Sequence, residues 1–82
     1  MKKISKALRR EAVEFAGCMA TFWADESLRS HSSMETFSAR ARNLALDAEG
    51  EAIEALGGAA DNEGAAHCWA EAQAMLLDGW TP

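Results

Sequence analysis

The sequence predicts an all-α fold, and three observations lead to this expectation. Eighteen of the 82 residues are Ala, the strongest helix former. Only six residues are β-branched and Tyr is absent, although strands favour both kinds of residue. Apolar residues recur at intervals of three and four along three stretches, as in amphipathic helices. We therefore expect a single domain over residues 1–82. Its predicted architecture is a compact three-helix bundle, a helical hairpin plus a shorter third helix.

The first helix is expected over residues 4–29. One apolar face comprises Ile4, Leu8, Ala12, Phe15, Met19 and Phe22. A second strip holds the smaller residues Val13, Gly17, Ala20 and Ala24, which would let another helix approach closely. Gly17 lowers helix propensity by about 1 kcal/mol relative to Ala. Either a close packing contact requires it, or it is tolerated at the surface.

The second helix is expected over residues 33–56. It follows a polar break in which Ser32 and Glu35 fit a capping box. Its main stripe contains Met34, Phe37, Ala41, Leu44, Ala48, Ala52 and Ala55. Leu46 and Ile53 fall on the far side, near Gly50, so this helix is apolar on two faces. It is either the central helix of the fold or part of a partner surface.

The third helix is expected over residues 62–78. Gly57 and Gly58 end the preceding helix, and Asp61 or Asn62 caps the new one. The apolar stripe contains Ala65, Trp69, Ala72 and Leu76. Gly79 occupies the position at which helices turn into the left-handed conformation, so Trp80 is expected to fold back onto Met75 in a Schellman-type contact.

The chain has few large anchors for a core, and a lone core of this size supplies only about 3–5 kcal/mol. Two apolar strips remain beyond those needed for the bundle. We therefore predict self-association through Val13, Gly17, Ala20 and Ala24, or through Leu46 and Ile53. Trp80 is a further candidate for an apolar docking surface.

Charge is distributed unevenly along the chain. Residues 1–10 carry five Lys and Arg residues and no acid, and residues 11–42 carry three Arg and five acids. Residues 43–82 carry eight acids and no Lys or Arg, and the net charge of the whole chain is −5. A negative potential over the C-terminal half repels phosphate and attracts basic protein surfaces. The candidate partner-binding residues are Asp47, Glu51, Glu54, Asp61, Glu63 and Glu71. Alternatively, these acids only keep an Ala-rich helical protein in solution.

The sequence predicts no catalytic residue, metal site or cofactor. Cys18, His31, His67 and Cys68 lack the paired spacing of a zinc site. Glu63, His67 and Glu71 share a helix face that is expected to be solvated. The chain lacks a continuous apolar run of the kind found in signal peptides or membrane spans, so we expect a cytoplasmic protein with reduced cysteines.

The leading functional prediction is a small, acidic, non-catalytic interaction protein that docks on a larger partner with a basic surface. In general character the chain is similar to accessory proteins of bacteriophages and mobile elements. The segregated acidic half, together with the absence of catalytic motifs, favours as a sharper hypothesis an inhibitor of a host nucleic-acid-binding defence complex. One alternative is a small dimeric regulator that binds nucleic acid through its basic N-terminus, Lys2, Lys3, Lys6, Arg9 and Arg10. Another alternative is a metal- or Cys-dependent enzyme.

Overall fold

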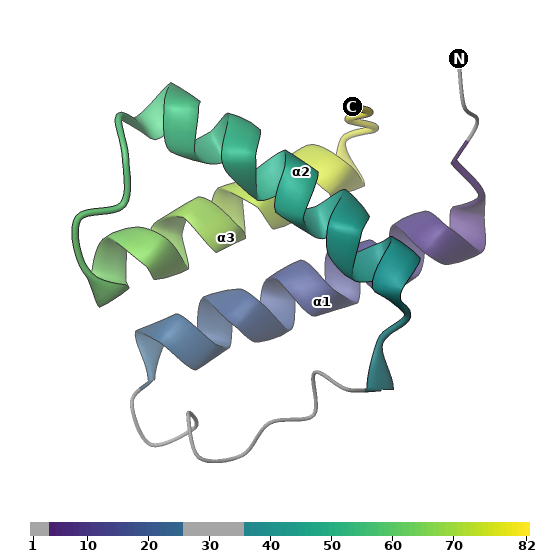
Figure 1. Cartoon of the computed structure of the whole chain (residues 1–82), viewed down its shortest axis with the longest axis horizontal. Helices are drawn as coiled ribbons and strands as arrows, with labels where there is room; N and C mark the ends of the chain where they lie inside the picture. The colour runs from purple at the N-terminus through teal and green to yellow at the C-terminus, as the bar shows by residue number, and fades with distance from the viewer. Residues whose placement is uncertain (1–3, 26–35) are drawn as a thin grey trace.

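The computed structural model describes residues 4–25 and 36–82. This part of the chain contains three helices, α1 (Lys6–Ala24), α2 (Ala39–Leu56) and α3 (Asn62–Leu77), and each of them packs against the other two (Figure 1). The predicted all-α three-helix bundle is therefore confirmed. The third helix agrees with its predicted range of 62–78 to within one residue.

The first helix ends earlier than predicted, and the second helix begins later than predicted. The first ends at Ala24 rather than at residue 29, because Asp25 adopts an extended backbone with φ −123° and ψ 106°. The second begins at Ala39 rather than at residue 33, and Ser38 is its N-cap. The predicted capping box of Ser32 and Glu35 lies outside the described residues.

A tertiary contact determines where α2 begins. The Ser38 hydroxyl accepts a hydrogen bond from the Ala41 N–H at 3.2 Å. The Ser38 backbone N–H and hydroxyl both donate to the carboxylate of Glu11, which belongs to α1. Because Glu11 holds the N-cap residue in place, Phe37 precedes the helix instead of lying on its predicted stripe.

The other helix termini follow local capping rules. The Ser5 hydroxyl accepts from the Leu8 N–H at 3.1 Å, and the Asp61 carboxylate accepts from the Gly64 N–H at 2.7 Å, which identifies Asp61 as the cap of α3. Gly57 ends α2 at a φ of 80° in the left-handed region. These hydrogen bonds satisfy backbone donors that the first helical turn leaves without partners.

The predicted Schellman motif at the end of α3 is confirmed in the backbone. Gly79 has a φ of 98°, its N–H donates to the Leu76 carbonyl at 3.3 Å, and the Trp80 N–H donates to the Met75 carbonyl at 2.9 Å. The chain therefore turns back, and the Trp80 side chain packs against the core cluster.

A hairpin followed by a shorter third helix makes the first two helices antiparallel neighbours, and the structure differs from this prediction. Since Ser38 contacts Glu11, α2 begins beside the first half of α1 rather than at its end, and α1 and α2 run in the same general direction (Figure 1). The antiparallel hairpin is formed by α2 and α3. Residues 25–38 make this arrangement accessible, because 14 residues can span up to about 46 Å when extended.

Alanine dominates the core of the described chain. Eight of the 13 buried apolar residues are Ala: Ala12, Ala16, Ala41, Ala45, Ala48, Ala52, Ala66 and Ala72. Phe15 is the central large side chain. Its ring makes edge-to-face contacts with Phe37 at 5.3 Å and with Trp69 at 5.7 Å between centroids. The predicted stripe of the second helix is correct from Ala41 to Ala52, whereas Ala55 is exposed.

Arg9, which belongs to α1, binds backbone carbonyls at the end of α3. Its Nη1 atom donates to the Leu76 carbonyl at 2.9 Å and to the Trp80 carbonyl at 2.8 Å. The last turn of α3 has no basic residue of its own. A guanidinium at this position adds charge-assisted hydrogen bonds to carbonyls at the end of α3 and complements the negative end of the helix dipole.

The side-chain amide of Gln73 lies against Gly17 in the middle of α1. Its side-chain Nε2 atom donates to the Val13 carbonyl at 3.2 Å. A Cβ atom at Gly17 would overlap this amide nitrogen. The Val13–Gly17 part of the small-residue strip therefore faces α3 inside the same chain.

Replacing Arg9 with Met retains much of the aliphatic stem and removes the guanidinium. We expect the free energy of unfolding to fall by about 2 kcal/mol, because a charge-assisted donor to the end of α3 is lost. Arg10→Met, at an exposed neighbouring position, is expected to change it by less than about 0.5 kcal/mol. Urea titration of both variants measures the difference, and equal losses would contradict the role assigned to Arg9.

Gly17 and Gln73 are expected to be energetically coupled. In a Gln73→Ala background, Gly17→Ala should raise the free energy of unfolding by about 1 kcal/mol through helix propensity alone. With Gln73 present, the gain should shrink or reverse, because the amide must move and loses its hydrogen bond to Val13, a contact of about 1 kcal/mol. A double-mutant cycle measures the coupling. The same effect of Gly17→Ala in both backgrounds would show that the two residues are independent.

Candidate functional site

Three of the predicted partner-binding carboxylates form a row on α2. Asp47, Glu51 and Glu54 are separated by four and three residues, so they share one helix face, and all three are exposed. The buried face of the same helix carries Ala48 and Ala52. The row therefore borders the core without taking part in it.

Two further carboxylates lie where α2 passes into α3. Asp61 and Glu63 are exposed, and both line a shallow hollow together with Leu56, His67 and Cys68. Asp61 is already engaged as the cap of α3, whereas Glu63 lies in the first turn of that helix. Negative charge in a first helical turn is stabilised by the helix dipole.

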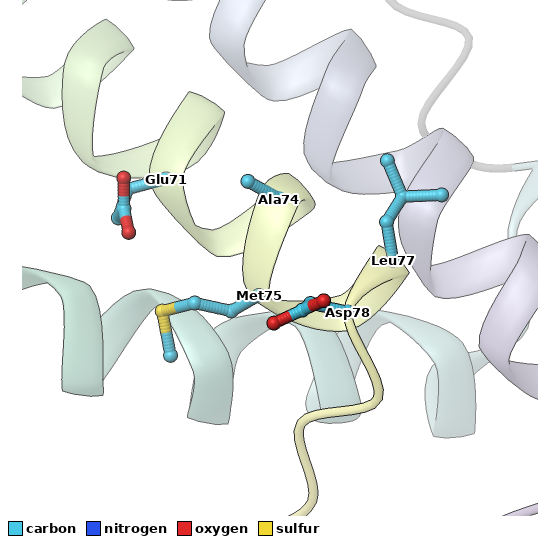
Figure 2. A pocket seen from close by; sticks show the side chains of 5 residues that line it. All are labelled: Glu71, Ala74, Met75, Leu77 and Asp78. Carbon is cyan, nitrogen blue, oxygen red and sulfur yellow. The ribbon is translucent and has the colours of Figure 1, made fainter.

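Glu71, the sixth candidate, lies on the outer face of α3. It lines a second shallow hollow with Ala74, Met75, Leu77 and Asp78. In Figure 2 the Met75 side chain lies between the carboxylates of Glu71 and Asp78. The six predicted residues thus occupy three parts of the α2–α3 hairpin: the α2 row, the connection and the outer face of α3.

The fold turns the charge separation along the sequence into a separation in space. The described cations lie at the beginnings of α1 and α2: Lys6, Arg9, Arg10, Arg40 and Arg42. Both beginnings lie at one end of the bundle, and the α2–α3 connection lies at the opposite end (Figure 1). Glu51, Glu54, Asp61 and Glu63 are at or near that connection. The bundle therefore has a basic end and an acidic end.

The two predicted apolar strips have different environments. In the α1 strip, Val13 and Gly17 face α3, while Ala20 and Ala24 line a shallow hollow with Glu63 and other residues of α3. On α2, Leu46 is 47% exposed. Ile53 is half-buried, as is Trp80. The use of any of these residues in an interface stays a prediction.

Cys68 is placed as an inert thiol. It is 1% exposed, and its Sγ atom lies 3.9 Å from the Gly58 carbonyl oxygen. Burial raises the pKa of the Cys68 thiol, and the negative charge of Glu49 raises it further. A protonated thiol is a poor nucleophile and a poor metal ligand at neutral pH. His31 lies outside the described residues, and within residues 4–25 and 36–82 no group of three or more His, Cys, Asp or Glu residues is placed to hold a metal ion.

The sequence pattern did not predict the structural roles of three polar residues. Arg9 was grouped with the basic N-terminus, although its guanidinium is held by the end of α3. Glu11 and Gln73 both reach across to another segment of the chain. The one available signal was their position, because each lies next to an apolar stripe of its helix.

No protein-family model, curated protein or solved structure matches this chain. In the described residues, none of the helices has the length and hydropathy needed to cross a bilayer.

Glu49 links stability to pH. Burial raises the pKa of this carboxyl group, so the ionised form is less stable in the folded than in the unfolded chain. The resulting destabilisation is fully present above the folded pKa and is lost as the pH falls through it. Glu49→Gln should therefore raise the thermal midpoint near pH 7 and have a smaller effect near pH 4.

Glu51→Gln, at an exposed position of the same helix, is the matched control for this measurement. It should leave the midpoint nearly unchanged at both pH values. A gain for Glu49→Gln that is larger near pH 4 than near pH 7 would have the wrong sign for a raised carboxyl pKa.

Proposed function

We propose that the protein is a non-catalytic interaction protein that docks its acidic α2–α3 hairpin on a basic surface of a larger protein. The supporting observation is that residues 43–82 carry eight carboxylates and no Lys or Arg. The six candidate residues are all exposed and distributed over both helices of the hairpin. Such a surface favours recognition by complementary charge.

The chemistry of the carboxylate row indicates which basic surfaces it suits. Arg and Lys groups that bind phosphate also bind carboxylates in charge-assisted hydrogen bonds. Asp47, Glu51 and Glu54 follow one another at about one-turn intervals, which gives a line of negative charge on a rigid helix. In its sharper form, the proposal is that this line occupies a groove in which a cytoplasmic defence complex of the host binds nucleic acid.

A second candidate function uses the opposite end of the bundle. Lys6, Arg10, Arg40 and Arg42 are exposed, and the contact between Glu11 and Ser38 brings the two helix beginnings together. This arrangement supports binding of nucleic acid through the basic end. Arg9 contributes less than the sequence indicated, because its guanidinium already donates to two carbonyls of the chain.

A charge-reversal experiment tests the leading proposal. The tagged protein captures its partner from a nuclease-treated bacterial lysate, and the purified complex is titrated. Glu51→Lys combined with Glu54→Lys should weaken the complex at least tenfold, about 1.4 kcal/mol, because two attractive contacts become repulsive. Raised salt should weaken the unmodified complex in the same direction.

Glu14→Lys combined with Asp78→Lys is the matched control, since it changes the net charge equally at exposed positions off the α2 row. It should alter affinity by less than about threefold. Failure to capture a stoichiometric partner, or equal weakening by both double variants, would refute docking through the row. Salt-sensitive DNA binding that is lost in Lys6→Glu with Arg10→Glu would instead support the second candidate.

A further inference from the structure

We propose that the outer face of α3 binds a basic amphipathic helix of another protein, in a shallow hollow where two carboxylates flank apolar side chains. The hollow is lined by Glu71, Ala74, Met75, Leu77 and Asp78, and we call it the α3 hollow (Figure 2). Apart from Leu77, these residues follow the spacing of positions along one side of a helix.

The α3 hollow contains apolar surface that the bundle does not cover. Leu77 is 69% exposed, more than any other large apolar side chain of the described residues. Figure 2 shows that the side chains of Leu77 and Met75 point to different sides of α3. Ala74 is exposed and has only a methyl group on the same stretch of helix. Because small residues allow helix axes to approach closely, a second helix can lie along α3 here and contact both larger side chains.

The charges at the end of α3 favour a cationic occupant. Asp78 is exposed and is the C-cap of the helix, and the last turn contains no basic residue. A carboxylate at this end opposes the helix dipole, whereas a cation is stabilised there. The guanidinium of Arg9 is close by, but it already donates to the Leu76 and Trp80 carbonyls. The carboxylates of Asp78 and Glu71 therefore add negative charge to an end of the helix that attracts cations.

The spacing of the α3 hollow specifies the pattern of the basic helix. Glu71 and Asp78 are separated by two helical turns, or about 10.5 Å along the axis. A pair of Lys or Arg residues at positions i and i+7 of a second helix has the same separation. Apolar side chains at i+3 and i+4 of that helix lie between its cations, just as Ala74 and Met75 lie between the two acids. The complementary helix thus repeats the spacing of α3 with the opposite charge.

Other occupants fit the α3 hollow less well. Nucleic acid and anionic lipids are repelled by the two carboxylates. A second α3 brings like charges together, because residues 43–82 contain no Lys or Arg. The basic start of the chain has cation pairs at the required spacing, Lys2 with Arg9 and Lys3 with Arg10, but Lys6 falls between both pairs where an apolar residue is needed. The pattern therefore favours a helix of a different protein over a second copy.

The α3 hollow is a second docking site, separate from the carboxylate row of Asp47, Glu51 and Glu54 on α2. Glu71 is the one residue of the hollow that belongs to the six candidate partner-binding residues. The proposal does not rest on docking of the row, because the two sites lie on different helices and take different partners. Each site can therefore be lost while the other is retained.

Titration of isotope-labelled protein with a synthetic peptide, followed by the amide NMR signals, tests the proposal. The probe is an Ala-based helical peptide of about 20 residues with Lys at i and i+7 and Leu at i+3 and i+4. It should shift the signals of residues 70–79 in a saturable manner, with a Kd below about 1 mM. An isomeric peptide with the two Leu at i+2 and i+5, on the opposite side of its helix, should bind at least about fivefold more weakly.

Equal binding of the two peptides, or the absence of a saturable shift, would overturn the proposal. Shifts of the same signals that depend on protein concentration without peptide would overturn it in favour of a second copy.

A pair of double variants tests the two carboxylates. Glu71→Gln combined with Asp78→Asn should weaken peptide binding at least about fivefold, because two ion pairs are lost. Glu51→Gln combined with Glu54→Gln removes the same charge from exposed positions of α2 and should change the Kd less than about twofold. Equal weakening by both would show that binding follows net charge and would overturn the site. Asp78→Asn alone should raise the thermal midpoint, since its carboxylate opposes the helix dipole, so its weaker binding does not reflect unfolding.

Discussion

The edge-to-face contacts of Phe15 hold together a core that is otherwise lined by alanine. Phe15 meets Phe37, which precedes α2, and Trp69 of α3, so one ring joins the three helical segments. Alanine lets the helices lie close but contributes little apolar area per residue. The bundle is also thin, with extents of 37 × 29 × 16 Å, and therefore has little interior. The orientation of the helices relative to one another consequently depends on a few directional contacts between them.

Those directional contacts are made by polar side chains that reach from one segment to another. Arg9 binds the end of α3, Glu11 binds the beginning of α2, and Gln73 binds the backbone of α1. Arg9 and Glu11 bind groups at helix termini, and Gln73 adds a second donor to a carbonyl inside α1. Together they set the beginnings of α1 and α2 at one end of the bundle. The separation of basic and acidic ends therefore follows from the same contacts that define the fold.

The surface divides into regions suited to different tasks. The carboxylate row on α2 is exposed beside the core stripe, whereas Leu46 and Ile53 lie on another side of the same helix. The two mid-helix glycines also differ in their surroundings. The side chain of Gln73 lies against Gly17, whereas Gly50 has open space around it.

From local physical chemistry the sequence by itself determined the helical class, the end of the second helix at Gly57 and the Schellman turn at Gly79. It narrowed the cap of the third helix to Asp61 or Asn62, and it placed Asp47, Glu51 and Glu54 on one helix face. These features depend on hydrogen bonds and periodicity within a few residues, which a sequence displays directly. Only the tertiary structure decided that α2 begins at Ala39, that α1 and α2 run in the same direction, and that Val13 and Gly17 face α3 while Leu46 remains exposed. These outcomes depend on contacts such as Glu11 with Ser38 and Arg9 with Leu76, whose partners are 27 and 67 residues apart. Spacing within one helix carries no information about which distant backbone group a charged side chain will satisfy.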